Sequence, residues 1–317
     1  STLTYFRKRP ISLIVLLAVF IWMILVFRWS SGSSSLESPT KSQSNDNIPI
    51  QPDKDSPKRN AQGIVIAPNG APTAQKPKLD AGAIANKVSN AKKVLVTYGQ
   101  NCCTAAKKRM CESAFKNGEM TAPRDECHAY DATVMDDEFQ KKNVNILKQG
   151  RGAGYWLWKP YIIYKWLTDD TMEDDNSYLI YSDAGAQVIG DVGHVLRFME
   201  ENDDIYKGVL FFGVGFDQQN FCKRDAFILQ DCDREECYKA MQINAFSGFF
   251  RKCEFSRMVV KKWLDDCQDE RILTDISNKM GKPNLSGFRD HRHDQAAITN
   301  IMVANGWNYD TSNGPIL

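Results

Sequence analysis

The sequence lacks the features that mark several large classes of protein. Lys and Arg number 40 against 39 Asp and Glu, so the formal net charge is +1, and no basic stripe outside the N-terminus is available to wrap nucleic acid. With 20 glycines and 12 prolines in 317 residues, a collagen-like or wholly disordered chain is excluded. No repeat with a period of about 20–50 residues occurs, which argues against solenoids and propellers. No Cys-x-x-Cys pair occurs either, so neither a dithiol redox enzyme nor a structural zinc site is expected.

A long apolar run lies near the N-terminus. Residues 11–27 (ISLIVLLAVFIWMILVF) carry no charge, and thirteen of the seventeen are Leu, Ile, Val or Phe. At roughly −0.3 to −0.6 kcal/mol each, these thirteen contribute about −4 to −8 kcal/mol to membrane insertion, and the run spans about 26 Å as a helix. The basic cluster Arg7, Lys8 and Arg9 precedes it, which predicts a cytosolic tail over residues 1–10 and a lumenal side after the span. We therefore expect a transmembrane signal anchor, with a cleaved signal peptide as the alternative.

The composition changes twice after this run. Residues 28–91 are rich in Ser, Pro, Asn, Gln and Lys without sustained apolar periodicity, which predicts a flexible stem. Residues 92–317 carry apolar runs, aromatic residues and all nine cysteines, and their length suits a single α/β domain. On the expected lumenal side up to four disulfides should form, with at least one thiol left unpaired within the chain. Asn284 begins an Asn-Leu-Ser sequon in a polar loop and is a candidate for N-glycosylation.

Apolar patterning predicts alternating strands and helices in this domain. Strands are expected at residues 93–98, 177–182, 209–212 and 245–250. Helices are expected at residues 105–116, 160–167, 192–199, 255–263 and 294–305. This alternation is typical of a mostly parallel sheet with helices on both faces.

One carboxylate stands where such a fold collects its ligands. In an open α/β sheet, ligands bind at the carboxyl ends of strands, and Asp183 directly follows the predicted strand 177–182. Ala184 and Gly185 come next and would leave room for a bulky ligand. An ordinary turn Asp followed by Gly is the alternative interpretation.

Four segments resemble those of one enzyme family, in matching order. YSDAGAQVIGD (181–191) resembles the acidic strand end of nucleotide-sugar glycosyltransferases of the GT-A fold, above all the glycogenin and lipopolysaccharide galactosyltransferase group. INAFSGFFR (243–251) is similar to that group's Asn-x-Gly strand on the acceptor side, and HDQAAITN (293–300) to its Asp-Gln-x-x-x-Asn helix start. GYWLWKPYII (154–163) lies where those enzymes place an Arg-bearing helix that contacts donor phosphates, and it is similar to a signature of capsule-type glycosyltransferases. The resemblance covers residues 94–307.

The resemblance implies a Rossmann-like GT-A domain that moves a sugar from a nucleotide sugar, with a UDP-sugar as the expected donor, to a hydroxyl of a glycan or glycoconjugate. With the predicted anchor, this would be a type II membrane enzyme of the Golgi or another secretory-pathway membrane. A non-catalytic relative that binds carbohydrate is the first alternative, and a disulfide-rich interaction domain is the second. The family's usual Asp-x-Asp metal motif is half kept, because Gly185 stands at its third position. A Mn or Mg ion, if used, would therefore have fewer protein ligands.

The implied reaction assigns roles to residues of these segments. A leaving diphosphate needs its charge neutralised, an acceptor hydroxyl needs orienting or a base, and a sugar ring packs on aromatic side chains. The expected catalytic residues are Asp183, Asp294 and Asp225. The expected donor-binding residues are Tyr98, Lys159, Ser182, Gly185, Lys223 and Arg224, with Arg151 as a further candidate cation. The expected acceptor-binding residues are Trp156, Trp158, Asn244, Ser247, Gly248 and Gln295, and the expected metal ligands are Asp183 and His293.

These residues also have structural interpretations. Trp156 and Trp158 alternate and could line a core layer. Residues 223–225 (Lys-Arg-Asp) could be a solvated turn with a surface ion pair. Asp294 precedes a helical run and suits an N-cap, which would make its surroundings a helix-capping, charge-paired loop. Lys159 could be the exposed cap of a helix that starts at Pro160.

Overall fold

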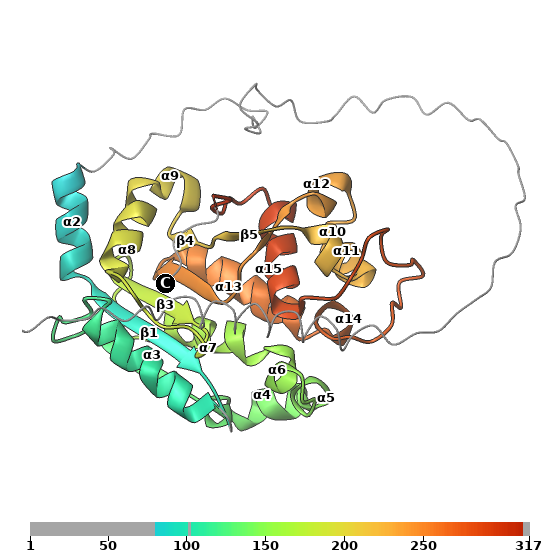
Figure 1. Ribbon diagram of the computed structural model, residues 1–317, viewed down its shortest axis with the longest axis horizontal. Helices are drawn as coiled ribbons and strands as arrows, with labels where there is room; N and C mark the ends of the chain where they lie inside the picture. Colours follow the sequence, from blue (N-terminus) through green and yellow to red (C-terminus); the bar gives the residue numbers. More distant parts are fainter. Residues whose placement is uncertain (1–79, 101–102, 313–317) are drawn as a thin grey trace, which may run out of the picture. The chain divides into compact units, whose positions relative to one another are not determined.

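The computed structural model describes residues 80–100 and 103–312 (Figure 1). The predicted cytosolic tail, the predicted anchor at 11–27 and most of the predicted stem lie outside the described residues. Within the described part of the chain, no helix is long and apolar enough to cross a membrane.

A five-stranded sheet forms the centre of the domain, with the strand order β2-β1-β3-β7-β4. β1 pairs in parallel with β2 and with β3. β7 is antiparallel to both β3 and β4, so four of the five strands point the same way. β5 and β6 form a separate antiparallel pair. The strands are β1 (Lys92–Tyr98), β2 (Glu126–Tyr130), β3 (Ser177–Ser182), β4 (Val209–Leu210), β5 (Gly213–Asp217), β6 (Met241–Ile243) and β7 (Ser247–Arg251).

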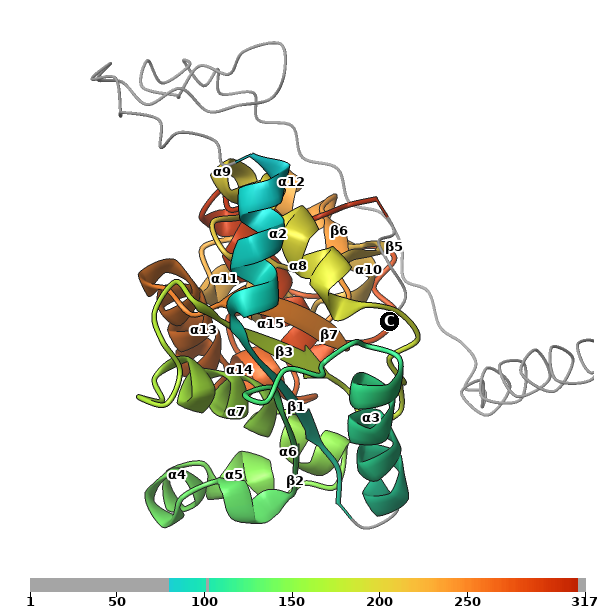
Figure 2. The ribbon, with the colours of Figure 1, turned by 90° about the vertical axis from the view of Figure 1, so that its left-hand side faces the viewer.

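Successive residues of the central strands point into two hydrophobic cores, one on each face of the sheet. In β3, Leu179 and Tyr181 belong to the first core, whereas Tyr178 and Ile180 belong to the second. Side chains from α7 (Trp158–Leu167), α13 (Glu254–Cys267) and α15 (His293–Ala304) build the first core. Those from α2 (Ala81–Asn90), α3 (Thr104–Lys116) and α8 (Val192–Glu201) build the second. Figure 2 shows α3 and α7 on opposite sides of the sheet. The prediction of a mostly parallel sheet with helices on both faces is confirmed.

The other helices are short and lie in the connections between these elements. They are η2 (Ala132–Val134), α4 (Asp137–Lys142), α5 (Val144–Leu147), α6 (Gly152–Tyr155), α9 (Asp203–Tyr206), α10 (Gln218–Phe221), α11 (Arg224–Leu229), α12 (Glu235–Tyr238) and α14 (Glu270–Leu273).

The predicted boundary between stem and domain at residue 92 is wrong, because residues 81–90 form helix α2. The Asp80 side chain caps this helix by accepting a hydrogen bond from the Ala83 amide. Ile84 and Val88, one turn apart, are buried in the second core. The Lys87 ammonium lies 2.6 Å from a carboxylate oxygen of Glu200 on α8. The ordered domain therefore begins no later than Asp80.

The end of β4 and the start of β7 differ from the prediction. β4 ends at Leu210 rather than at 212, and Phe212 instead bridges to Asp310. β7 begins at Ser247 rather than at 245, because the chain turns over residues 244–246. The Phe246 carbonyl of this turn accepts a hydrogen bond from the Asp183 amide (2.8 Å), so the turn fixes the residue that follows β3.

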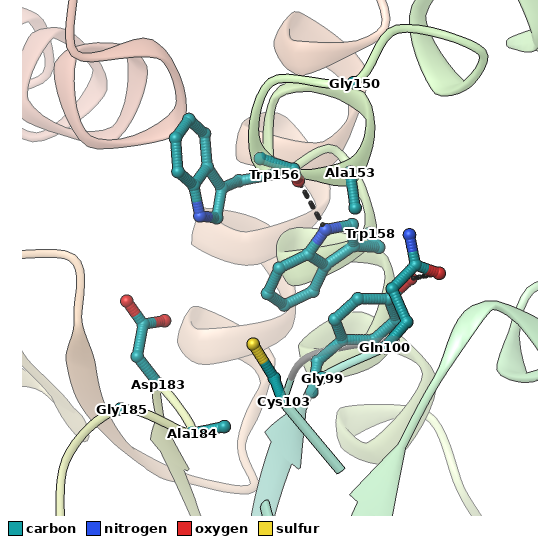
Figure 3. A pocket seen from close by; sticks show the side chains of 12 residues that line it. Gly99, Gln100, Cys103, Gly150, Ala153, Trp156, Trp158, Asp183, Ala184 and Gly185 are labelled. Carbon is teal, nitrogen blue, oxygen red and sulfur yellow. Dashed lines mark hydrogen bonds between the residues drawn. The ribbon is translucent and has the colours of Figure 1, made fainter. Parts of the chain in front are cut away.

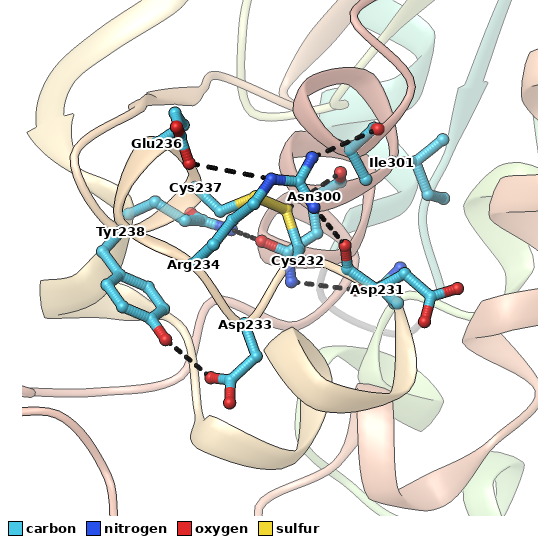
Figure 4. The surroundings of a disulfide bond; sticks show 12 residues. Asp231, Cys232, Asp233, Arg234, Glu236, Cys237, Tyr238, Asn300 and Ile301 are labelled. Atoms are coloured by element: carbon cyan, nitrogen blue, oxygen red, sulfur yellow. Dashed lines mark hydrogen bonds and ion pairs between the residues drawn. A yellow bond between two sulfur atoms is a disulfide. The ribbon is translucent and has the colours of Figure 1, made fainter. Parts of the chain in front are cut away.

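Two disulfides lie within the described residues, where up to four were expected in the whole domain. Cys111–Cys127 joins α3 to β2, and Cys232–Cys237 ties α12 to the short loop that precedes it. In that loop, Arg234 donates to the carbonyls of Asp231 and Ala304, which ties it to the end of α15 (Figure 4). Cys222, Cys253 and Cys267 are buried thiols.

Candidate active site

A cavity of about 350 Å3 lies at the carboxyl ends of β1 and β3, where ligands bind in open α/β sheets. The cavity is lined by the β1–α3 turn, the segment that leads into α7 and the residues after β3: Tyr98, Gly99, Gln100, Cys103, Gly150, Gly152, Ala153, Trp156, Trp158, Asp183, Ala184 and Gly185. Asp183 carries the only charge in this set. Figure 3 shows its carboxylate on one side of the cavity and the indoles of Trp156 and Trp158 on the other.

The aromatic wall of the cavity is built from two neighbouring elements. The Trp158 ring stacks on Tyr98 of β1, with ring centroids 3.8 Å apart and an interplanar angle of 14°. The Trp158 indole N–H donates to the Gly152 carbonyl (3.0 Å). Trp158 is 5% exposed and belongs to the first core. Trp158 is therefore a core residue that also lines the cavity.

The segment that carries this wall is a left-handed turn. Five successive residues have positive φ: Gly152 (55°), Ala153 (52°), Gly154 (92°), Tyr155 (53°) and Trp156 (60°). A Cβ at Gly152 would lie 2.4 Å from the Trp156 ring. For the three residues other than glycine, this conformation costs roughly 1–2 kcal/mol each. Strain of this size persists only where surrounding contacts impose it, and it gathers at functional sites.

Lys159, Asp183 and Asp294 form a charge cluster beside the cavity, and Lys159 is its centre. Its side chain is 3% exposed, and its ammonium lies 2.7 Å from Asp294 Oδ2 and 3.5 Å from Asp183 Oδ1. The ammonium also donates to the Ala245 carbonyl (2.9 Å) and lies 5.2 Å from the centre of the Tyr181 ring. The interpretation of Lys159 as an exposed helix cap is therefore wrong. α7 starts at Trp158, and Lys159 turns inward from its first turn.

The two carboxylates of this cluster have different environments. Asp294 is buried, and burial raises its pKa to about 6 although Lys159 acts in the opposite direction. Burial lowers the pKa of Lys159, but the charges of Asp183 and Asp294 more than offset it, so that pKa lies above its ordinary value. The Asp183 side chain is 37% exposed, and its Oδ1 also accepts a hydrogen bond from the Tyr181 hydroxyl. Burial, and then the Asp183 charge, raises the pKa of Tyr181 well above its usual range.

Asp294 is not the N-cap of its helix. α15 starts at His293, Arg292 takes the cap position, and Asp294 is the second helical residue. From there its carboxylate points inward to Lys159. Asp294 and Lys159 therefore lie beside Asp183, as the sequence predicted, but neither lines the cavity.

The structure does not bring Lys223, Arg224 and Asp225 to the cavity. The Lys223 ammonium donates to the carbonyls of Thr274 (3.2 Å) and Ile276 (2.6 Å). Arg224 pairs with Asp233 at 2.7 Å. The fully buried Asp225 accepts hydrogen bonds from two successive backbone amides, at residues 279 and 280. All three side chains hold neighbouring loops in place, and none of them lines the cavity.

Of the predicted acceptor residues other than the two tryptophans, Ser247 and Gly248 are buried, and Asn244 and Gln295 are half-buried. Asn244 Oδ1 accepts from the Phe246 amide (3.3 Å), which shapes the turn below Asp183. Ser247 pairs with Ser182 across the β3–β7 ladder, and both are buried. Gly248 is closely packed, since a Cβ there would lie 2.7 Å from the Phe211 ring. The remaining predicted acceptor residue, Gln295, donates to the Gln242 side chain and accepts from the Ala245 amide. None of these side chains lines the cavity.

His293 is 2% exposed and lies behind the aromatic wall. Its Nδ1 lies 2.8 Å from the Leu273 carbonyl, and burial lowers its pKa. Among the described residues, no three His, Cys, Asp or Glu side chains form a group able to hold a metal ion. A Cβ at Gly185 would have no atom within 4 Å, so the position of the missing second carboxylate is open space.

Six cavity residues are not among those that the sequence predicts: Gly99, Gln100, Cys103, Gly150, Gly152 and Ala153. The rule that ligands gather at strand ends, applied to the strand 93–98 as well as to 177–182, would have found the first three. The glycines of the GAGYW segment were the available signal for the left-handed turn.

Comparison with known proteins gives little further information. No family model matches the chain, and no curated protein matches it. Among solved structures, the apo structure of WbbM, a bifunctional glycosyltransferase, aligns with 70% of this chain at 8% identity and a TM-score of 0.40. The alignment spans 39% of that protein. At this level of similarity, function has to be inferred from the residues of the site.

Proposed function

We propose that this domain is a glycosyltransferase of the GT-A fold that moves a sugar from a nucleotide sugar to a hydroxyl of a glycan or glycoconjugate. One observation carries the proposal: a single carboxylate, Asp183, faces two tryptophans across a cavity at the carboxyl ends of parallel strands. The cavity volume, about 350 Å3, falls within the range of small-molecule sites, about 300–1,000 Å3. The four sequence segments that resemble the family support the same assignment, with a UDP-sugar as the expected donor.

In this proposal Asp183 acts directly on the substrate. Its Oδ1 is held by the Tyr181 hydroxyl and lies near Lys159, which orients the carboxylate toward the cavity. In an inverting transfer, the acceptor oxygen would attack the anomeric carbon while the bond to the diphosphate breaks, and the carboxylate would take the acceptor's proton. Trp156 and Trp158 would pack against a sugar ring. Lys159 has a positioning role, because its ammonium is buried among protein groups.

The described lining residues include no Lys, Arg or His to neutralise a diphosphate. A divalent cation would fit this donor set only as a shared site, with Asp183 as its protein ligand and with phosphate and water supplying the other oxygens. In that case Asp183 would lie on the leaving-group side and would not be the acceptor's base, because in an inverting transfer the acceptor attacks from the opposite face. A bound Mn or Mg ion would stabilise the charge that develops on the leaving diphosphate. His293 is too deeply packed behind Trp156 to take part, and we do not retain it as a ligand.

The decisive experiment screens a panel of nucleotide sugars for hydrolysis and transfer by the full-length protein, with and without Mn2+. Asp183→Asn should lower transfer by about 10²–10⁴-fold, as expected for loss of a catalytic base. Its fold should be unchanged, since Asn can still accept from Tyr181. Asp204→Asn, at an exposed residue outside the cavity, is the control. Full activity of Asp183→Asn would remove Asp183 from the site.

The same panel distinguishes the alternative of a non-catalytic carbohydrate-binding protein, which the open position at Gly185 favours. That alternative predicts saturable binding of a sugar or nucleotide sugar without turnover under any metal condition. A nucleotide at 100 times its Kd should stabilise the fold by about 2.7 kcal/mol. No stabilisation by any nucleotide or sugar would leave an interaction domain as the remaining interpretation.

We further propose that the domain lies in the lumen of the Golgi or another secretory-pathway compartment, anchored by residues 11–27 as a type II membrane protein. The two disulfides support an oxidising compartment. Asn284 is exposed, and its Oδ1 accepts hydrogen bonds from the Arg224 amide and the Asn278 side chain. A glycan would attach to its Nδ2. Protease added to sealed microsomes should spare the chain after Arg28, and Asn284→Gln should abolish an endoglycosidase-sensitive mobility shift. Digestion of the domain in intact vesicles would refute this topology.

A further inference from the structure

The left-handed turn at 152–156 is held from outside by one arginine. Arg151, the residue immediately before the turn, donates from Nη1 to Asp275 Oδ2 (2.8 Å) and from Nη2 to Asp290 Oδ2 (2.9 Å). Asp275 and Asp290 stand near the two ends of one long irregular segment, residues 274–292, between α14 and α15. A planar guanidinium can bridge two carboxylates in a fixed geometry, which the single charge of a lysine cannot do.

The 274–292 segment, which Arg151 binds, is also held by buried side chains of residues 223 and 225. The Lys223 ammonium binds the carbonyls of Thr274 and Ile276, on either side of Asp275. Asp225 binds two backbone amides of the same segment, at residues 279 and 280. These buried side chains fix the part of the segment that carries Asp275.

The other side of the turn is fixed by ring packing. The Trp156 ring stacks on His293, with centroids 5.4 Å apart and an interplanar angle of 20°. The Tyr155 ring packs on the same histidine at 4.8 Å. His293 Nδ1 in turn lies 2.8 Å from the carbonyl of Leu273, the last residue before the 274–292 segment. Trp156 therefore lines the cavity and packs on His293.

We infer that Arg151 is a positioning residue: by clamping the turn to Asp275 and Asp290, it holds Trp156 in the cavity wall and sets the affinity for the sugar ring of the acceptor that packs there. This inference rests on the proposed function. The hydrogen bonds from Arg151 to Asp275 and Asp290, which we call the clamp, do not depend on any ligand. The three charged side chains are 36–44% exposed, so their value to overall stability is small, and their effect is on the geometry of the turn.

The test compares Arg151→Gln with Arg257→Gln in the full-length protein. Arg257 forms a two-bond pair with Asp174 at 2.9 Å and 2.9 Å, and neither residue lines the cavity, so it is a matched control. Hydrogen exchange of the amides of residues 152–157 should be about five- to tenfold faster in Arg151→Gln and unchanged in the control. The acceptor KM should rise by a similar factor while kcat changes less than about twofold, because ring binding and not chemistry is affected.

Asp290→Asn should reproduce part of the effect, and Arg151→Gln with Asp290→Asn should have no more effect than Arg151→Gln alone, because both remove one interaction. Arg151→Lys should restore the exchange rates only in part. Unchanged exchange at 152–157 would overturn the clamp. Faster exchange with an unchanged acceptor KM, or with a change confined to the donor KM, would overturn its link to acceptor binding. If no substrate is turned over, the proposed function fails, whereas the exchange rates still decide the clamp.

Discussion

Replacing Lys159 by methionine tests whether the buried charge cluster is correctly described. Methionine keeps most of the side-chain length and removes the charge. Three oxygens would lose their partner: Asp294 Oδ2 at 2.7 Å, the Ala245 carbonyl at 2.9 Å and Asp183 Oδ1 at 3.5 Å. Asp183 can turn to solvent, since its side chain is 37% exposed. Asp294 cannot, because it is 4% exposed. The stability of the variant is therefore governed by Asp294.

The magnitude follows from the protonation of this carboxyl group. In the wild type, burial raises the pKa of Asp294 to about 6, against about 3.9 in an unfolded chain. Between these two pKa values the folded state binds more protons than the unfolded state, so stability falls as the pH rises, and the fall ends near pH 6. Without the ammonium the folded pKa rises further, and the fall continues above pH 6 by up to about 1.4 kcal/mol per pH unit.

The expected loss of stability in Lys159→Met is about 2–4 kcal/mol at pH 7, combining the protonation of Asp294 with an unpaired Ala245 carbonyl. Urea denaturation at pH 6 and pH 8 measures it, and the deficit should be larger at pH 8. In Lys159→Met with Asp294→Asn, the additional dependence on pH should disappear. Lys261→Met removes an exposed i,i+4 pair with Asp265 and should cost less than about 0.5 kcal/mol.

Two results would refute this reasoning. The first is a Lys159→Met variant as stable as the wild type at both pH values, which would mean that the ammonium is not buried against Asp294. The second is a pH-dependent deficit that persists in the double variant, which would place the titrating group elsewhere.

Three further predictions concern the cation, the domain boundary and the buried carboxylate of Asp225 in α11. Gly185→Asp, at a position with no neighbouring atom within 4 Å, should fold normally and bind Mn2+ without nucleotide, as measured by calorimetry, whereas the wild type should bind it only with nucleotide. A truncated protein that starts at Lys92 lacks α2, exposes the apolar surface that α2 covers, and should be less stable in urea or aggregate, compared with one that starts at residue 73. Asp225→Ala removes the buried carboxylate that accepts from two backbone amides and should cost about 1–3 kcal/mol in urea denaturation.

The parts of the fold that the sequence predicts are those whose side chains repeat with a clear period. The strand 177–182 is buried on both faces and Asp183 follows it, so its bounds and the place of Asp183 at its carboxyl end were both predicted correctly. α2 was missed because only Ile84 and Val88 are large apolar residues among Ala, Gly, Asn and Ser. Its N-cap Asp80, four residues before Ile84, was the signal that could have revealed it.

Tertiary structure decides the rest of the site. Lys159 stands in a segment that reads as an amphipathic helix start, and only the packing of α7 against residues 245 and 294 shows that its ammonium is buried. Lys223, Arg224 and Asp225 have the residue types of a phosphate site but meet a loop distant in sequence. The two glycines of GAGYW indicate a turn, but they do not predict a run of five positive φ values, because Ala, Tyr and Trp disfavour that conformation unless other residues impose it.

The two sides of the cavity differ in how well they tolerate substitution, because the left-handed turn forms one side and Gly185 lies on the other. Almost any larger residue at 152 or 154 would collide with Trp156 or Leu147, so the aromatic side offers little freedom for a change of specificity. Across the cavity, a Cβ at Gly185 would have no atom within 4 Å, so a side chain can start there without moving a neighbour. Substitutions that aim to alter this cavity should therefore be placed at Gly185 and should leave 152–159 untouched.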